Sequence, residues 1–132
     1  MPERTLEQLR AANALAKVRS VESTTSAAAF ASYVASLAPS ILNNGLGQSC
    51  ASLLARAKDR VDDPYHLLYQ ALQDWLCRDA NDAPYPPGDL MAALTGGDRY
   101  TYLRAQAEAL AWLEWLKRFS AAYLKPEGPE AP

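Results

Sequence analysis

The sequence predicts a single compact all-α domain of five to six helices, of which the last is long. Apolar residues recur at spacings of three and four in several windows, whereas no window sustains the alternation of large β-forming residues that is typical of a strand. The 132 residues suffice for one hydrophobic core but not for two domains. With 49% hydrophobic and 21% charged residues the composition is globular, although 25 alanines supply much of the hydrophobic share. We expect a helical domain over residues 1–124 and a flexible tail over residues 125–132.

The first half of the chain is predicted to form three helices. The first runs from Thr5 to about Val21, because the segment Thr5–Gln8 fits a capping box. The second ends at Asn43-Asn44-Gly45, where Gly45 suits a left-handed C-cap, and Pro39 should kink or restart it because proline has no N–H to donate. The second and third helices each place apolar side chains on one face: Phe30, Val34, Leu37 and Ile41, then Leu46, Cys50, Leu53, Leu54 and Ala57.

The second half is predicted to form two or three more helices. Asp63-Pro64 fits an N-cap followed by a first-turn proline. A proline-rich loop over residues 79–89 leads to a short helix, Leu90 to Leu94, which ends at Gly96-Gly97. The last helix is expected from about Asp98 to Leu124. The apolar faces of the two longer helices are Leu68, Leu72, Trp75 and Leu76, then Tyr102, Ala105, Ala109, Trp112, Leu113, Leu116, Phe119 and Tyr123.

Charge and cysteine content exclude several classes of protein. The net charge is −2 and the pI is near 5.3, so the chain is not a histone-like or ribosomal basic protein. Cys50 and Cys77 form neither a disulfide framework nor a zinc pattern, and we expect small buried hydrophobic side chains in a reducing compartment. The segment from Ser23 to Ala55 carries no charge, but its Pro, Gly, Asn and Ser residues exclude a membrane span. No apolar signal segment follows Met1, so a cytoplasmic protein is expected.

The patterns that would indicate catalysis are weak. His66 is the only histidine, and Asp59, Asp62 and Asp63 precede it without the fixed ligand spacing of a zinc or iron site. A surface or capping role at a helix N-terminus is favoured for these residues. The sequence contains no Gly-rich phosphate cradle after a strand and no assignable nucleophile–base pair. We therefore predict no enzyme activity, no cofactor and no metal.

The charged residues are unevenly distributed along the chain. Residues 1–58 carry a net +3, residues 59–98 carry −6 and residues 99–132 carry +1. The two ends of the chain could therefore share a mildly basic face, and ordinary solvated charge is the alternative. On the first helix, Arg10, Asn13 and Lys17 form one stripe that is available for a phosphate or a partner's carboxylate.

Two further helix faces have the composition of contact surfaces. On the last helix, a row containing Trp115 runs roughly opposite the core face, and a tryptophan flanked by arginines is typical of an interface. Packing of Trp115 on a neighbouring helix is an equally open alternative. On the second helix, a face of small uncharged residues would let a like subunit approach closely, and an alanine-rich composition is the alternative explanation. The Trp115 row is Arg104, Glu108, Ala111, Trp115, Arg118 and Ala122, and the small-residue face is Ala28, Ser32, Ala35 and Ser36.

Two segments of the chain resemble one protein family. The first runs from Tyr33 to Gln48 and contains Asn44-Gly45-Leu46-Gly47-Gln48. The second runs from Tyr102 to Leu110 and leads into Trp115-Leu116-Lys117-Arg118-Phe119. With a looser fit of the first helix, these segments are similar to the small subunit of the type III-B CRISPR effector, the Cmr (RAMP-module) complex. The likeness spans nearly the whole chain.

The resemblance implies a non-catalytic, all-helical protein of prokaryotic antiviral defence. Copies of such a subunit stack along the backbone subunits that hold the guide RNA and help to hold target RNA by its sugar–phosphate chain. The implied partners are the other Cmr subunits, further copies of this chain, and guide and target RNA, with no membrane. Because the pI is acidic, we expect negligible RNA affinity for the isolated chain. The basic residues expected to face RNA are Arg10, Lys17, Arg19, Arg56, Lys58, Arg104, Lys117 and Arg118.

Three alternatives stay open. A helical protein–protein adaptor without nucleic-acid contact would use the Trp115 row and the small-residue face. The small subunit of the related type III-A complex is also helical. A metal enzyme built on His66 would lose metal or activity on the substitution His66→Ala.

Overall fold

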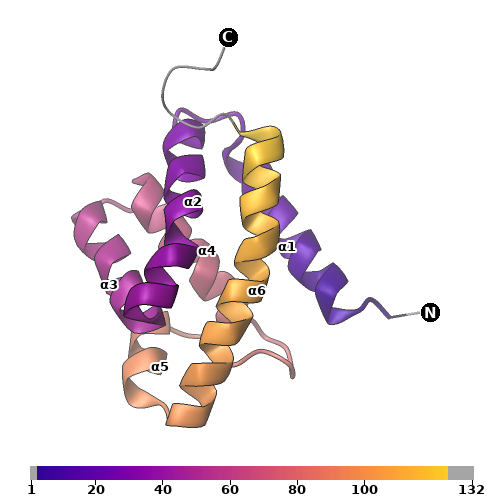
Figure 1. Ribbon diagram of the computed structural model, residues 1–132, viewed down its shortest axis with the longest axis vertical. Coiled ribbons are helices and arrows are strands. Elements are labelled where there is room, and N and C mark those ends of the chain that lie inside the picture. The colour runs from indigo at the N-terminus through magenta and orange to yellow at the C-terminus, as the bar shows by residue number, and fades with distance from the viewer. Residues whose placement is uncertain (1–2, 125–132) are drawn as a thin grey trace.

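The computed structural model describes residues 3–124, which form six α-helices and, within that range, no strand (Figure 1). The predicted all-α fold with a long C-terminal helix is therefore confirmed. The expected flexible tail, residues 125–132, lies outside the described residues. The helices are α1 (Leu6–Val21), α2 (Ala27–Asn44), α3 (Leu46–Ala57), α4 (Pro64–Leu76), α5 (Leu90–Gly96) and α6 (Arg99–Tyr123).

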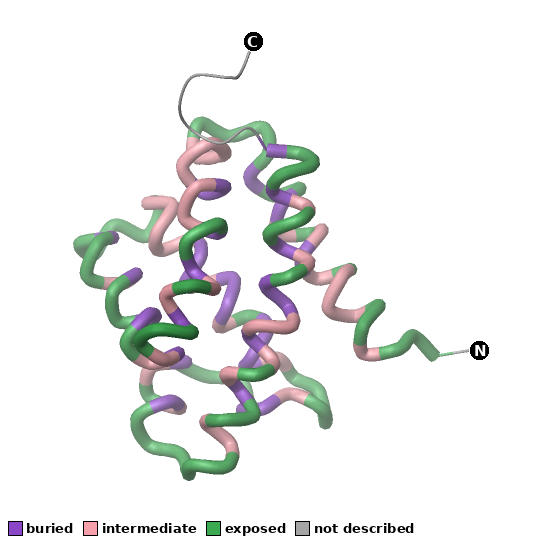
Figure 2. Tube along the Cα trace, in the orientation of Figure 1, coloured by how far each residue is buried: buried purple, intermediate pink, exposed green. Residues whose placement is uncertain are grey.

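The long helix α6 organises the domain. It packs against α1 on one side and α2 on the other, and α4 packs against α2, α3 and α6 (Figure 1). The short helix α5 contacts α3 at the end of the molecule where α6 begins. Figure 2 shows that the buried positions lie on the inward faces of these helices, and Trp112 is the largest of the fully buried side chains. The hydrophobic core therefore lies where α1, α2, α4 and α6 meet.

Side chains cap four of the helices at the positions that local sequence indicates. Thr5 Oγ1 accepts a hydrogen bond from the Gln8 N–H at 3.0 Å, and Gln8 Oε1 accepts one from the Thr5 N–H at 2.8 Å, which confirms the capping box. Asp63 caps α4 ahead of Pro64, and Asp89 caps α5. Asp98 caps α6, and the hydrogen bond from the Thr101 N–H lowers the pKa of the Asp98 carboxyl.

The structure differs from two details of the predicted helices. Helix α2 runs from Ala27 to Asn44 through Pro39, so of the kink or restart expected there the restart does not occur. Pro39 and Ala35, whose carbonyl loses its helical partner, are both exposed, so water can solvate that carbonyl. On α6, Ser120 is buried whereas Tyr123 is 45% exposed, because the buried stripe turns toward α2 at its C-terminal end.

The corner between α2 and α3 is held by two side chains of α6. Gly45 connects the helices with a φ of 88°, a conformation that side chains rarely adopt. At the start of α3, the Leu46 N–H donates to Gln106 Oε1 at 2.9 Å and the Gly47 N–H donates to Tyr102 Oη at 2.8 Å. A Cβ on Gly47 would lie 3.3 Å from Tyr102 Oη. Side chains of α6 thus satisfy backbone donors that a helix N-terminus otherwise leaves unpaired.

We expect Tyr102→Phe and Gln106→Ala each to lower the free energy of unfolding by about 1 kcal/mol, because each leaves one N–H of the α3 N-terminus without its acceptor. Urea unfolding followed by circular dichroism measures both changes. The matched control is Gln48→Ala on the same turn, where the side chain is exposed and a change below about 0.5 kcal/mol is expected. Equal losses in all three variants would contradict the capping role.

Both cysteine thiols are free and buried, as the sequence predicts. Burial raises the pKa of the Cys50 thiol to about 12 and that of Cys77 to about 11, from an ordinary value of 9.0. Within residues 3–124, no helix is both long and apolar enough to cross a membrane.

Native thiols should therefore react with a thiol reagent at pH 8 at least about a hundredfold more slowly than thiols of the unfolded chain. Above pH 9 the unfolded thiols ionise while the native thiols stay protonated, which stabilises the unfolded state. The thiol contribution to stability is thus fully present below pH 9 and decreases as the pH rises toward 11 to 12. Stopped-flow labelling and urea titrations from pH 7 to 11 test both statements. Rapid labelling of the native protein would refute the burial of these thiols.

Candidate nucleic-acid interface

The basic stripe of α1 is engaged within the chain. Arg10 forms a two-point ion pair with Glu108, with Nε to Oε2 at 2.6 Å and Nη2 to Oε1 at 2.8 Å. Lys17 pairs with Asp74 at 2.5 Å, and Asn13 Oδ1 accepts the indole N–H of Trp112 at 2.9 Å. Carboxylates and an indole of the same chain therefore occupy the stripe that the sequence left available to a phosphate or to another chain.

Part of the Trp115 row faces α1 instead of lying opposite the core. The side chain of Glu108 is only 10% exposed and also accepts the indole N–H of Trp75 at 3.0 Å. Trp115 is partly buried, stacks on Phe119 and donates its indole N–H to Glu7 Oε1 at 3.1 Å. These two members of the row join helices within the domain.

The same contacts set the charge states along the α1–α6 seam. The hydrogen bond from Trp115, opposed by some desolvation and assisted by Arg10, lowers the pKa of the Glu7 carboxyl. The hydrogen bond to Glu108 raises the pKa of the Arg10 guanidinium. Both groups are therefore held in their charged forms.

The other predicted RNA-facing residues divide by whether a carboxylate neutralises them. Arg19 pairs with Glu22 and lies over the Tyr123 ring, and Arg118 pairs with Glu114. The Arg104 guanidinium donates to the backbone carbonyl of Asp82 at 3.1 Å. Besides Arg104, three candidates among residues 3–124 have no carboxylate partner in the ion pairs: Arg56, Lys58 and Lys117.

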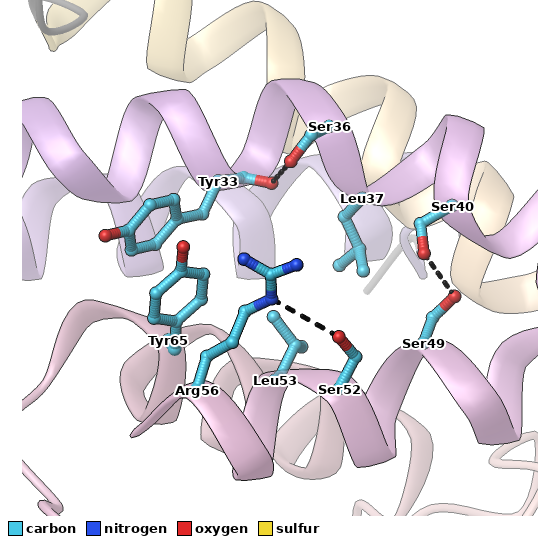
Figure 3. A pocket seen from close by; sticks show the side chains of 9 residues that line it. All are labelled: Tyr33, Ser36, Leu37, Ser40, Ser49, Ser52, Leu53, Arg56 and Tyr65. Atoms are coloured by element: carbon cyan, nitrogen blue, oxygen red, sulfur yellow. Dashed lines mark hydrogen bonds between the residues drawn. The ribbon is translucent and has the colours of Figure 1, made fainter. Parts of the chain in front are cut away.

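A cleft of about 230 Å³ with a mixed polar and apolar lining lies between α2 and α3, and the Arg56 side chain extends into it from the last turn of α3 (Figure 3). One end is closed by Tyr33 and Tyr65, whose rings stack with centroids 3.6 Å apart. The walls carry serine hydroxyls from both helices, and those of Ser40 and Ser49 are 2.7 Å apart. The cleft thus combines a guanidinium, hydroxyl groups and aromatic rings.

The small-residue face of α2 is divided between two grooves. Ser32 and Ala35 line a groove of about 360 Å³ between α2 and α6, with Lys117 at its border. Ser36 instead lines the cleft between α2 and α3, and Ala28 is partly buried near the start of α2.

Among the residues considered for a metal site, Asp63 has a structural role. His66 is partly buried, with its ring 6.2 Å from that of Tyr69, and Asp63 caps α4. No group of three His, Cys, Asp or Glu side chains in the described part of the chain is arranged to hold a metal ion.

Sequence reasoning placed Ser36 on the small-residue face but did not predict that serines and tyrosines would line a cleft between α2 and α3. A signal was present on α3, where Ser49, Ser52 and Arg56 recur at spacings of three and four. The approach of Tyr33 to Tyr65 has no such signal, because it depends on how α2 packs beside the start of α4.

Comparison with known proteins gives two similarities. Residues 6–123 match the family described as CRISPR-associated protein (Cas_Cmr5). The crystal structure of a CRISPR-associated Cmr5 family protein from Thermus thermophilus is similar over 92% of this chain and 100% of that chain, with a TM-score of 0.73 and 24% sequence identity. At this identity the structural likeness concerns the fold. No curated protein matches the chain in sequence.

Proposed function

Because the chain belongs to the Cas_Cmr5 family of CRISPR-associated proteins, and is thus a small subunit of a type III-B Cmr complex, we propose that its role there is non-catalytic. In this proposal, copies of the chain stack along the backbone of the guide-bound complex and help to hold target RNA. The main support for this proposal is the extent of the family match, which begins at the first residue of α1 and ends at the last residue of α6.

Contacts with other subunits are supported by exposed apolar side chains and by the small-residue face. Tyr100 and Leu103, at the start of α6, are 76% and 54% exposed. Large exposed apolar side chains are typical of surfaces that a partner covers. In this proposal, a second backbone approaches α2 closely at the groove beside Ser32 and Ala35. We propose that neighbouring Cmr subunits, including further copies of this chain, cover these surfaces.

Contact with RNA is supported by the basic residues that no carboxylate neutralises. A few phosphate contacts of this kind are weak and salt-sensitive by themselves. In an assembly, several copies act together and the combined affinity increases. We propose that Arg56, Lys58 and Lys117 contact RNA within the complex, and that Arg10 and Lys17 support the fold.

Native mass spectrometry tests the proposal. The purified chain is mixed with guide-loaded backbone subunits, with and without target RNA, and the masses give the number of copies incorporated. We expect several copies, and we expect Lys58→Ala/Lys117→Ala to incorporate normally but retain less target. Failure of the wild-type chain to incorporate would refute the proposed function.

The second candidate function is an adaptor that contacts only protein. The observation favouring it is that four predicted RNA-facing residues pair with carboxylates of their own chain: Arg10, Lys17, Arg19 and Arg118. An adaptor would incorporate into the complex, and target retention would not respond to Lys58→Ala/Lys117→Ala.

A further inference from the structure

Beside the apolar side chains of Leu37 and Leu53, the walls of the cleft between α2 and α3 offer hydrogen-bond donors and no carboxylate. In the Ser40–Ser49 pair one hydroxyl donates to the other, so one of the two protons remains for a further acceptor. Ser52 Oγ accepts from Arg56 Nε at 3.4 Å, and its own proton is likewise left to donate. The lining is thus suited to a group that accepts several hydrogen bonds.

Arg56 supplies the positive charge of the cleft. Figure 3 shows its guanidinium between the two helices, with the terminal nitrogens directed away from Ser52 and toward α2. No residue from Ser23 to Ala55 is charged, so α2 and the preceding turns of α3 add no competing carboxylate. Within the described residues, no acidic side chain lies within ion-pair distance of Arg56. An anion entering the cleft would therefore meet an unneutralised guanidinium fork.

The stacked Tyr33 and Tyr65 rings form one end of the cleft. The Arg56 guanidinium carbon lies 5.7 Å from the centroid of the Tyr65 ring, within the range of a cation–π contact. This contact limits the orientations of a side chain that is otherwise exposed. Aromatic rings beside an arginine are also typical of proteins that bind single strands of nucleic acid.

The size of the cleft limits what it can hold. Its volume of about 230 Å³ is below the roughly 300 Å³ at which sites for drug-sized ligands begin. It therefore accommodates one small group better than a whole nucleotide. We propose that the cleft between α2 and α3 holds one phosphodiester group of single-stranded RNA, bound by the Arg56 guanidinium and by the serine hydroxyls. This inference rests on the proposed function, because the assembled complex brings the RNA to the cleft.

Target binding by the assembled complex tests the proposal. Complexes containing wild-type chain or Arg56→Gln are titrated with labelled target RNA at several salt concentrations. We expect Arg56→Gln to weaken target binding about tenfold. The slope of log affinity against log salt should decrease by about 0.7 for each copy in contact, since one phosphate contact is lost. Arg56→Lys should recover part of the affinity, because it keeps the charge but not the fork.

Two further variants separate the cleft from general charge. Arg60→Gln removes the same charge four residues away, from an exposed arginine paired with Asp63 at 3.7 Å, and should change affinity less than twofold. Ser40→Ala/Ser52→Ala should weaken binding about threefold without changing the salt slope, because it removes donors and no charge. Thermal unfolding of each isolated variant reports whether it folds as the wild type does.

The outcomes distinguish the inference from the function on which it rests. Normal incorporation of Arg56→Gln with target binding equal to that of Arg60→Gln would overturn the inference and leave the proposed function standing. Loss of incorporation in Arg56→Gln alone would overturn it too, by assigning the cleft to a protein contact. Failure of the wild-type chain to incorporate would refute the proposed function itself. If target affinity is unchanged, and millimolar inorganic phosphate shifts the Arg56 Nε resonance of the isolated chain, the cleft binds free phosphate instead of RNA.

Discussion

Replacing Trp112 by alanine is expected to lower the free energy of unfolding by about 4 kcal/mol. Trp112 is fully buried at the centre of α6, where α1, α2 and α4 converge. The substitution removes the largest buried side chain, leaves a cavity and deprives Asn13 of the indole N–H that it accepts at 2.9 Å. A domain is typically stable by only about 5 to 15 kcal/mol, so this variant should be close to its stability limit.

Urea unfolding followed by circular dichroism measures the effect, and Trp115→Ala on the same helix is the matched control. Trp115 is only partly buried, and we expect its loss to cost about 1.5 kcal/mol. If Trp112→Ala does not fold, Trp112→Phe should still show a loss of about 2 kcal/mol. Equal losses at Trp112 and Trp115 would contradict the position of the core on α6.

Replacing Glu108 by alanine is expected to lower the free energy of unfolding by about 2.5 kcal/mol. The partly buried Arg10 charge keeps only its 3.4 Å contact with Glu7, and the buried Trp75 N–H loses its acceptor. The matched control is Glu114→Ala. Glu114 lies on the same helix and also pairs with an arginine, Arg118, but its side chain is 63% exposed. An exposed pair of this spacing contributes about 0.3 to 0.5 kcal/mol.

A double variant checks the explanation. Arg10→Met/Glu108→Gln removes both charges, and the glutamine carbonyl can still accept the Trp75 N–H. We therefore expect the double variant to lie within about 1 kcal/mol of the wild type, and thus to be more stable than Glu108→Ala. If the double variant instead lost as much stability as the separate Arg10→Met and Glu108→Gln variants lose together, the ion pair would not be the cause. Chemical denaturation in urea keeps ionic strength constant in this comparison.

The helix boundaries were predictable because they depend on neighbours in sequence. The Thr5–Gln8 capping box, the Asp63-Pro64 start of α4 and the Asp98 cap of α6 all act within three residues. The end of α2 at Gly45 was likewise predictable from the Asn-Asn-Gly segment, although the ψ of 161° lies outside the left-handed helical region predicted for this cap. The resemblance to the Cmr small subunit was also correct, since it rests on the order of the residues along nearly the whole chain.

Which basic residues pair with a carboxylate was not predictable from neighbours in sequence. Arg10 and Glu108 are 98 residues apart in sequence, and Lys17 and Asp74 are 57 apart. Helical periodicity shows only that each side chain lies on a certain face of its own helix. From the helical pattern alone, Arg56 and Arg10 are equally available to a phosphate. Only the packing of α1 on α6 neutralises Arg10, while α2 and α3 present no acid to Arg56.

The sequence by itself determined the all-α class, the long last helix, the capped helix ends, the buried cysteines and the family. These properties follow from local hydrogen bonding, from apolar periodicity and from the order of residues along the chain. The tertiary structure decided that Glu108 and Trp115 join α1 to α6, that Gln106 and Tyr102 cap α3, and that a cleft around Arg56 separates α2 from α3. Such contacts join helices distant in sequence, so they depend on crossing angles and rotations that no single helix specifies.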